Sequence, residues 1–368
     1  MRPMPYFRTL TLGTALATTL ALTPLHATQA AGAAAFADPL DTPARVSPRA
    51  VRSPVFALAP VDADHIVGVG PRGHILRSAD RGKTWTQQPS PVSTDLVAVH
   101  FPTPKLGWAV GHDGVVLRST DGGVSWTRVL DGRGLGKLMV AHYEKALVAG
   151  DTSVAKALED AKRMAAEGPT KPFLSVYFRS ANEGWLVGQF NLILHTADGG
   201  ATWQPWLDRT ENPDGYSLHA IRAAGDEVYI VGELGLVLGL DAGARRFKRI
   251  KTPYPGTWFG LAAMKGALVA VGLRGAAWAS TDAGANWRQL NTATNASINN
   301  GMFLPDGRLV LVTQQGRVLT SADLRDIAEL PRVPGLASAF DIVTMEPGWL
   351  LISGPGGVQR LALPPAPQ

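Results

Sequence analysis

Short apolar stretches recur along the chain, and successive stretches are joined by tight turns that contain glycine. Short apolar runs bounded by turn residues are typical of β-strands. In seven places a first run ends in Val-Gly or a related dipeptide, and a second run begins two or three residues later. These dipeptides are Val69-Gly70, Val110-Gly111, Val187-Gly188, Val231-Gly232, Val271-Gly272, Val312-Thr313 and Ser353-Gly354. Their second residues are 41, 77, 44, 40, 41 and 41 residues apart, which predicts seven related units and one insertion.

A second motif, Ser/Thr-x-Asp-x-Gly-x-x-Trp, follows four of these units, with weaker copies beginning near Asp241 and Ser321. An aspartate can accept hydrogen bonds from turn amides, glycine adopts backbone conformations closed to other residues, and tryptophan can pack back onto a hairpin. We therefore interpret this Asp-box motif as a structural turn and not as a set of catalytic acids. Its aspartate and tryptophan pairs are Asp80 and Trp85, Asp121 and Trp126, Asp198 and Trp203, and Asp282 and Trp287.

The long interval lies between Trp126 and Phe173, where the strand pattern stops. Apolar residues from Leu138 to Leu147 fall on one helical face, and a second helical pattern ends at Gly168-Pro169. We predict a helical hairpin at residues 135–168, inserted between units 2 and 3. The alternative is an extra degenerate unit with a strand at 146–150, but its flanks lack an Asp box.

Each remaining unit has room for four short strands; in unit 2 these are 96–101, 108–111, 115–118 and 126–130. Repeated four-stranded antiparallel units predict an all-β fold, a seven-bladed β-propeller over residues 43–363 with a tail at 364–368. The last unit runs out of chain before a fourth strand, so we expect residues 43–49 to supply that strand and close the ring.

In a propeller, the turn between the second and third strands and the connection between blades lie on one face, and the Asp-box turns lie on the other. The polar residues after each Val-Gly dipeptide should therefore gather around one mouth of the central channel, together with the helical hairpin. Convergent polar groups beside an irregular insertion make a candidate binding site, although they could also be ordinary solvated turn residues. The candidates for partner binding are Arg72, His112, Asp113, Gln189, Asn191, Glu233, Arg274 and Gln315.

Residues 1–30 contain Arg2 and Arg8, an acid-free apolar run of 13 residues from Leu10 to Leu22, and small residues before Ala30. This is the pattern of a secretory signal peptide that is cleaved near Ala30. The alternative, a retained anchor, needs about 20 apolar residues to cross a bilayer. We therefore predict a periplasmic, soluble monomer without stable membrane insertion, with a flexible leader at 31–42.

Candidate chemistry is sparse. The chain has no cysteine, so disulfides and thiolate chemistry are excluded. The histidines lack metal-binding spacing, so we expect no metal and no cofactor. His112-Asp113 could suggest a general base, but no nucleophile accompanies it. The net charge of +5 is too scattered for nucleic acid; the basic cluster at 245–251 is either a solvated edge or a docking patch for an acidic partner or lipid headgroups.

The four Asp boxes, Gly107-Trp108-Ala109-Val110-Gly111 and Gly184-Trp185-Leu186-Val187-Gly188 resemble the photosystem II stability and assembly factors, a family of BNR-repeat propellers. The resemblance covers about residues 45–363 and implies a non-enzymatic assembly factor or scaffold that holds a membrane protein through one face. The helical insertion and the missing amino-terminal cysteine make the chain more similar to relatives in non-photosynthetic proteobacteria. The resemblance to these relatives implies that the partner is a membrane protein or a membrane-associated complex, and a transporter is one candidate partner.

Sialidases share the Asp box, which leaves a sialidase-like glycoside hydrolase or a carbohydrate-binding propeller as the alternative. Sialidases use three arginines, a tyrosine nucleophile and acidic residues. On the expected face only Arg72 and Arg274 stand out, and Tyr177 and Tyr229 lie inside predicted strands. The sequence therefore favours a protein that is not an enzyme.

Overall fold

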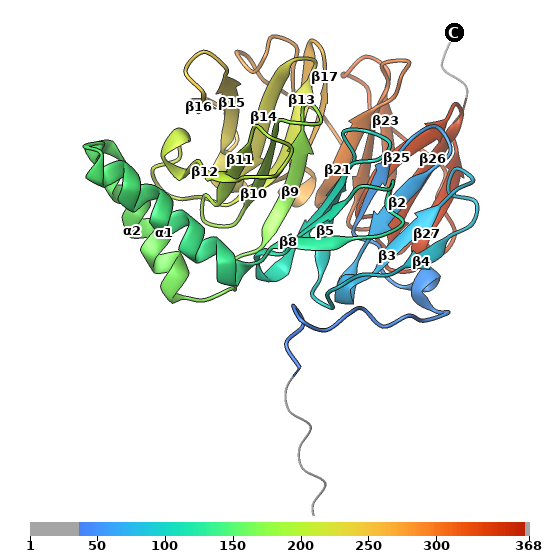
Figure 1. The fold of residues 1–368 in the computed structure, drawn as a ribbon. Coiled ribbons are helices and arrows are strands. Elements are labelled where there is room, and N and C mark those ends of the chain that lie inside the picture. The colour runs from blue at the N-terminus through green and yellow to red at the C-terminus, as the bar shows by residue number, and fades with distance from the viewer. Residues whose placement is uncertain (1–36, 365–368) are drawn as a thin grey trace, which may run out of the picture. The chain divides into compact units, whose positions relative to one another are not determined.

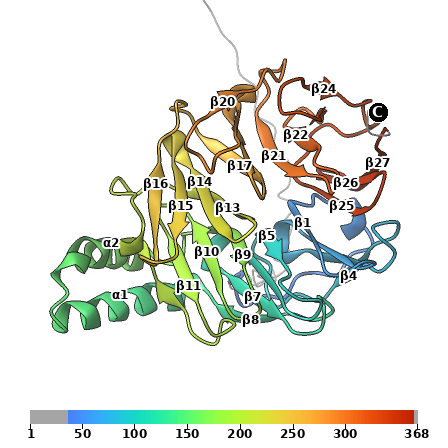
Figure 2. The ribbon, with the colours of Figure 1, turned by 90° about the horizontal axis from the view of Figure 1, so that it is seen from above.

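Seven antiparallel sheets surround a common centre in the computed structural model, which describes residues 37–364 (Figures 1 and 2). Each sheet is one blade, and its strands follow one another in chain order. The first strands of neighbouring blades are in contact all around the ring, and the first strand of blade 7 contacts that of blade 1. The predicted seven-bladed β-propeller is thereby confirmed.

The strands of blades 1 to 4 are β1 (Ala57–Pro60), β2 (Ile66–Val69), β3 (Ile75–Ser78), β4 (Thr86–Gln88); β5 (Leu96–His100), β6 (Gly107–Gly111), β7 (Val116–Ser119), β8 (Thr127–Leu130); β9 (Phe173–Phe178), β10 (Gly184–Gly188), β11 (Ile193–Thr196), β12 (Gln204–Pro205); and β13 (Leu218–Ala224), β14 (Glu227–Gly232), β15 (Val237–Asp241), β16 (Arg246–Ile250). Those of blades 5 to 7 are β17 (Trp258–Met264), β18 (Ala267–Gly272), β19 (Ala277–Ser280), β20 (Arg288–Gln289); β21 (Ile298–Phe303), β22 (Leu309–Thr313), β23 (Val318–Ser321), β24 (Ala328–Glu329); and β25 (Ile342–Glu346), β26 (Trp349–Gly354), β27 (Gly357–Ala362).

Blade 7 contains three strands, so the prediction that residues 43–49 would supply a fourth strand is wrong. These residues run beside blade 1 instead, where Ser47 N donates to Gln87 Oε1 at 2.8 Å and Ala44 N donates to Ser90 O at 3.1 Å. Pro43 and Pro48 lack backbone N–H groups, which disfavours a regular strand here. The ring closes through the 3-10 turn Ala50–Arg52, which packs against β27.

The insertion is a helical hairpin, as predicted, and it starts three residues earlier than expected. Helix α1 spans Gly132–Val148, a 3-10 turn spans Thr152–Val154, and helix α2 spans Ala155–Ala166. The Asp131 carboxylate caps α1 by accepting hydrogen bonds from the amides of Arg133 and Gly134 at 3.0 and 3.3 Å. The buried face of the hairpin packs in one cluster with residues of blades 2 and 3, namely Trp108, Val110, Val116, Phe173, Val176, Phe178, Leu186, Leu192 and Leu194.

The Asp boxes form tight turns between the third and fourth strands. In blade 1, Asp80 Oδ1 accepts hydrogen bonds from Lys83 N at 3.0 Å, Thr84 N at 2.8 Å and the Ser78 hydroxyl at 2.7 Å. Gly82 has a φ of 77°, and the Trp85 indole donates to its carbonyl at 3.2 Å. Asp121, Asp198 and Asp282 accept the same amide contact from the residue four positions later.

These hydrogen bonds lower the pKa of the Asp-box carboxylates. The side-chain hydrogen bond from Thr84, together with the amide of that residue, lowers the pKa of Asp80 to about 2. Thr202 does the same for Asp198, whose pKa is also about 2. A carboxylate held ionised by its own turn is suited to organise backbone and not to deliver protons.

The expected leader at 31–42 ends earlier than predicted, because residues 38–42 pack on the propeller. Leu40 is only 1% exposed and lies in a core cluster with Val92, Leu96 and Trp126. The predicted signal peptide at 1–30 lies outside the described residues. Within residues 37–364, no helix is both long enough and apolar enough to cross a bilayer.

Candidate functional site: the turn face and the central cavity

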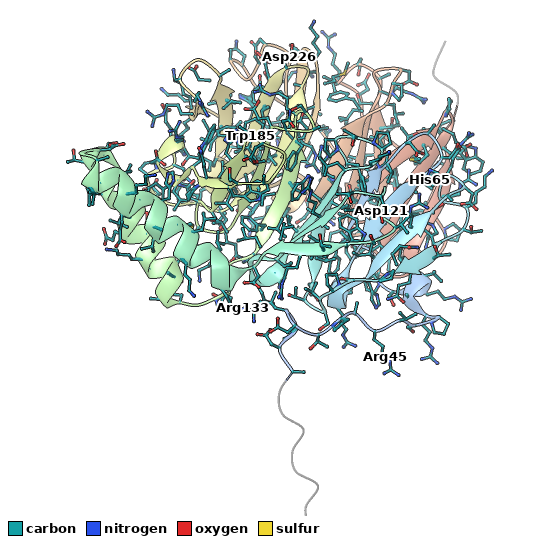
Figure 3. The ribbon with its side chains drawn as sticks, viewed as in Figure 1. Arg45, His65, Asp121, Arg133, Trp185 and Asp226 are labelled. Atoms are coloured by element: carbon teal, nitrogen blue, oxygen red, sulfur yellow. The ribbon has the colours of Figure 1, made fainter. Side chains whose placement is uncertain are left out.

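One face of the propeller carries the turns between second and third strands and the connections between blades; we call it the turn face. The helical hairpin joins blades 2 and 3 on this face, as predicted, and residues 38–49 also run along it (Figure 1). Figure 3 shows Arg45 and Arg133 on this side and Asp226, in a turn between first and second strands, on the opposite side. The turn face therefore combines repeated turns with two segments that lie outside the repeat.

The turns between second and third strands share one conformation. The second residue after the Val-Gly dipeptide is left-handed in blades 1 to 5, with φ between 49° and 56° for Arg72, Asp113, Phe190, Leu234 and Arg274. A left-handed glycine follows in four of these blades. At Gly275 a Cβ would lie 1.9 Å from the Thr294 carbonyl oxygen, so the turn packs against the next connection too closely for any side chain.

Three of the predicted binding residues hold the connections between blades. The Asp113 carboxylate accepts a hydrogen bond from the Thr94 hydroxyl at 2.6 Å, and the Glu233 carboxylate accepts one from Ser217 N at 2.8 Å. Asn191 is 8% exposed; its amide group donates to Leu207 O at 3.1 Å and its carbonyl accepts from the Thr210 hydroxyl at 2.9 Å. These contacts give Asp113, Glu233 and Asn191 a structural role in holding the connections between blades.

The other five predicted residues leave more surface free. Arg72, His112, Arg274 and Gln315 are exposed on the turn face, and Gln189 is half-buried. Arg274 also lines a hollow of about 810 Å³ between blade 5 and its neighbouring connections, where Tyr254, Leu273 and Thr292 are among its walls. A role of these residues in partner binding stays a prediction.

Exposed apolar side chains on the turn face were missed by the sequence reasoning, which followed polar residues only. Phe190 is 50% exposed, Leu234 is 54% exposed and Leu273 is 38% exposed, and all three lie in the turns of blades 3 to 5. The ammonium group of Lys171 lies 5.5 Å from the centre of the Phe190 ring. We call Phe190, Leu234 and Leu273 the apolar turn residues. The signal that could have found them is the presence of a large apolar residue where the other turns have a polar one.

The helical hairpin is fixed to blade 3 through Tyr143, which is fully buried. Its hydroxyl donates to Asp208 Oδ1 at 2.9 Å and accepts a hydrogen bond from Leu207 N at 2.9 Å. Burial, with the nearby Asp208 charge, raises the pKa of Tyr143 far above its usual value. The hairpin is therefore docked by a specific polar contact in addition to its apolar face.

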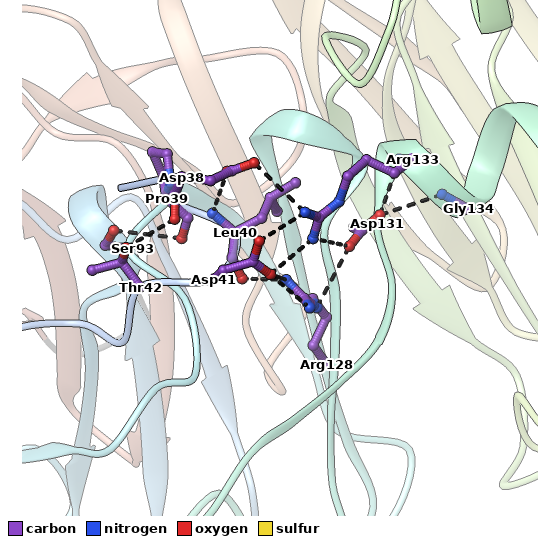
Figure 4. A network of polar contacts seen from close by, with 10 residues as sticks. All are labelled: Asp38, Pro39, Leu40, Asp41, Thr42, Ser93, Arg128, Asp131, Arg133 and Gly134. Atoms are coloured by element: carbon purple, nitrogen blue, oxygen red, sulfur yellow. Dashed lines mark hydrogen bonds and ion pairs between the residues drawn. The ribbon is translucent and has the colours of Figure 1, made fainter. Parts of the chain in front are cut away.

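The segment before blade 1 is fixed to the base of the hairpin by an ionic network (Figure 4). Arg133 donates to both carboxylate oxygens of Asp41, at 2.8 and 3.0 Å, and to Asp131 at 2.9 Å. Arg128 also donates to Asp41, at 3.1 Å. The hydrogen bond from Arg133, followed by that from Arg128, lowers the pKa of Asp41 to about 2. Two segments far apart in sequence are thereby joined on the turn face.

A central cavity of about 620 Å³ lies between the first strands of the seven blades. None of the eight predicted binding residues lines it; they lie in the turns outside the first strands, and their place around the channel mouth stays a prediction. The physical reason is that the dipeptide turns follow the second strand of each blade, whereas the channel is bounded by the first.

The residues that do line the cavity near the start of each first strand form what we call the collar. In blades 2 to 6 a register shift leaves one residue unpaired after the first residue of the strand, a bulge that redirects the side chain. The collar consists of these residues and their counterparts in the other blades, Phe56, Val97, Leu174, His219, Phe259, Asn299 and Phe340. Their spacing follows the repeat, so aligning the units on their first strands could have found them.

His112 and Asp113, the possible general base and its orienting carboxylate, do not hydrogen-bond to each other in the described part of the chain. His112 is exposed, while Asp113 engages Thr94. Within the described residues, no group of three or more histidine, cysteine, aspartate or glutamate side chains could hold a metal ion.

The sequence matches the family described as Photosynthesis system II assembly factor YCF48 over residues 49–138 and 161–326. The chain belongs to this family. The interruption between the two matched parts falls inside the helical hairpin, and blade 7 lies beyond the second matched part.

Two curated relatives carry the same family name. The photosystem II assembly lipoprotein Ycf48 of Synechococcus sp. (strain CC9902) is 27% identical over 147 residues, which are 39% of this chain and 44% of the relative. The photosystem II assembly protein Ycf48 of Thermosynechococcus vestitus (strain NIES-2133 / IAM M-273 / BP-1) is 33% identical over 66 residues, 18% of this chain and 19% of the relative. The matches span less than half the length of either relative.

Solved structures show the same fold. YCF48 bound to a D1 peptide superposes with a TM-score of 0.61 at 17% identity, covering 86% of this chain and 95% of that one. YCF48 from Cyanidioschyzon merolae gives 0.60 at 16%, covering 84% and 95%. The GH74 enzyme of Niastella koreensis gives 0.55 at 16%, covering 83% of this chain and 51% of the enzyme. At these identities the likeness establishes the propeller fold alone.

Proposed function

We propose that this protein is a non-enzymatic assembly factor that is exported to the periplasm and holds a subunit of a membrane complex on its turn face. Membership of the YCF48 family carries the proposal. The solved relative with a D1 peptide supports a membrane protein as the kind of partner. A transporter subunit is one candidate partner, and we expect the factor itself to act as a monomer.

The apolar turn residues and the hairpin support the turn face as the docking surface. Phe190 and Leu234 are large apolar side chains at left-handed positions, with φ of 55° and 49°, where asparagine or glycine would be less strained. Exposure of such residues in successive blades is typical of an interaction surface. The hairpin joins its two blades on the same face, and Val148 at the far end of α1 is 90% exposed.

The test is affinity capture of membrane proteins from detergent-solubilised membranes of the native host, quantified by mass spectrometry. The variant Phe190→Asn/Leu234→Asn removes apolar surface with a residue that tolerates the left-handed turn. Val124→Asn is the matched control, because Val124 is 46% exposed in an Asp-box turn on the opposite face. We expect the double variant to recover about thirtyfold less of one specific membrane protein, since losing an interface hot spot costs about 2 kcal/mol.

Removing residues 135–168 outright is a weaker test, because the hairpin covers Trp108 and Phe173, which are fully buried. Its loss would expose core surface of blades 2 and 3. Equal recovery by the double variant and the control would contradict docking on the turn face. Capture of the bait alone would contradict the scaffold function itself.

The alternative is a sialidase-like glycoside hydrolase or a carbohydrate-binding propeller. The shared Asp box and the structural similarity to a GH74 enzyme support this alternative. The Asp-box carboxylates engage their own turns, which argues against their use in catalysis. A panel of fluorogenic sialosides and other glycosides decides the matter: turnover above that of the buffer would replace the assembly-factor proposal.

A further inference from the structure

The central cavity contains an arginine that lacks an acidic partner. Arg222 lies on β13, three residues beyond the collar residue His219, and lines the cavity. Its Nη1 donates to Ile221 O at 2.8 Å and to the Ser175 hydroxyl oxygen at 3.3 Å. Among the described residues, neither its Nε nor its Nη2 donates a hydrogen bond. A guanidinium has five N–H donors, so much of this cation faces the cavity without a partner.

The acidic side chain in the cavity wall is engaged elsewhere. Asp341, which is 8% exposed, accepts hydrogen bonds from Leu58 N at 2.8 Å, Ile342 N at 2.8 Å and the Asn300 side chain at 2.6 Å. It forms no ion pair with Arg222 within 4 Å. Burial raises the pKa of Asp341, against the opposing effect of the Arg222 charge. The carboxyl group thus stabilises the backbone of blades 1 and 7 and leaves Arg222 available.

His100, which also lines the cavity, adds no charge near neutral pH that could compete with Arg222. His100 donates from Nε2 to Phe178 O at 3.1 Å, and burial lowers its pKa to about 4. His219 donates from Nδ1 to Trp258 O at 2.7 Å and stacks on Phe259, with 6.1 Å between ring centres. Among the residues that line the cavity, Arg222 is the one arginine, and no lysine is present.

The collar is mainly apolar and aromatic. Phe56 and Phe340 meet edge to face, with 5.8 Å between ring centres, and Val97, Leu174 and Phe259 complete the apolar part. A ligand that entered from the turn face would meet this collar before it reached Arg222. The cavity volume of about 620 Å³ lies in the range of small-molecule sites.

We propose that the central cavity binds a small organic carboxylate with an apolar body. The carboxylate accepts hydrogen bonds from Nε and Nη2 of Arg222, and the apolar body packs against the collar. One cation in a mainly apolar wall suits a monoanion, because a phosphate dianion would call for further cationic donors. The Tyr177 ring, on the neighbouring first strand, also lines the cavity and extends its aromatic surface.

Calorimetric titration of the purified protein with phenylacetate tests this proposal, with the uncharged phenylacetamide as the chemical control at matched ionic strength. We expect saturable phenylacetate binding that Arg222→Met weakens about tenfold, the loss expected for a charge-assisted hydrogen-bond pair. Arg325→Met, at an exposed arginine outside the cavity, should bind phenylacetate as the unchanged protein does. If Arg222→Met does not fold, Arg222→Lys keeps the charge without the planar fork and should bind more weakly.

Crystals soaked with 4-bromophenylacetate provide a readout that needs no variant, because the anomalous signal of bromine places the ligand directly. A peak in the central cavity with the carboxylate on Arg222 supports the proposal. The proposal would be overturned by any of four results: no saturable phenylacetate binding, equally tight binding of phenylacetamide, equally tight binding of sulfate in the same titration, or a bromine peak outside the central cavity. The partner-capture experiment above probes the turn face and is independent of this outcome.

Discussion

Replacement of Tyr143 by phenylalanine probes how the hairpin is fixed to the propeller. The phenylalanine ring would fill the same fully buried space, so the change removes the hydroxyl and little else. Two contacts disappear, the 2.9 Å hydrogen bond to the Asp208 carboxylate and the 2.9 Å hydrogen bond from Leu207 N. Leu207 is itself buried, so its N–H group would be left without a partner.

The magnitude follows from these two losses. A hydrogen bond to a charged group contributes about 1.5–3 kcal/mol, and an unsatisfied buried donor costs about 1–3 kcal/mol, with overlap between the two values. We expect Tyr143→Phe to lower the free energy of unfolding by about 2–3 kcal/mol. For a domain of this size that corresponds to a fall of about 3–4 °C in the unfolding midpoint.

The assay combines denaturant unfolding with hydrogen exchange of the α1 and α2 amides, which should exchange faster in the variant because the hairpin opens more readily. Tyr254→Phe is the matched control, since its hydroxyl donates to Leu273 O at 3.0 Å in an exposed position and water can replace it. That variant should lie within about 0.5 kcal/mol of the unchanged protein. An equally small effect of Tyr143→Phe, with unchanged exchange, would refute the docking role of the hydroxyl.

Two further predictions concern the turns. Gly275→Ala should destabilise the fold by more than about 3 kcal/mol, because its Cβ would lie 1.9 Å from a carbonyl oxygen. The control is Gly215→Ala, where φ is a similar 72° but nothing lies within 4 Å of the added Cβ, and it should cost only about 1–2 kcal/mol. Denaturant unfolding measures both variants, and equal costs would contradict the close approach at Gly275. Asp198→Asn should lower the unfolding midpoint at pH 7, and the difference from the unchanged protein should shrink as the pH falls from about 4 towards 2. The sign follows from the pKa of Asp198, which is about 2 in the folded state and 3.8 ordinarily, so the ionised carboxylate stabilises the fold above about pH 4 and this stabilisation is lost as the pH falls towards 2. Thermal unfolding of both proteins at several pH values measures the difference. A difference that does not depend on pH would argue against stabilisation by the Asp198 carboxylate.

Much of the architecture was open to sequence reasoning because it depends on local chemistry that is repeated. Each Asp box organises its own turn through contacts within eight residues, so Asp80 and Trp85 reveal it without any tertiary information. The hairpin was also visible, because its apolar period differs from that of the strands on either side. Ring closure was predicted wrongly: which segment meets β27 depends on packing between the two ends of the chain, and the prolines at 43 and 48 redirect that segment.

The candidate site shows the same division. Polar turn residues such as Asp113 and Asn191 were found from the repeat, but their hydrogen bonds to neighbouring connections became visible only in the structure. The collar depends on bulges that redirect single residues towards the axis, and a one-residue shift of register is not readable from an apolar stretch. Arg222 lacks an ion pair with Asp341 because of the distance between blade 4 and blade 7, which the sequence does not reveal.

The sequence by itself determined the seven units, the Asp-box turns and the inserted hairpin, because each follows from residues close together in the chain. Only the tertiary structure decided what lies at the centre of the ring and on the turn face. There, residues from all seven blades meet across long sequence separations, and which donors, charges and apolar groups end up without a partner is a property of their packing.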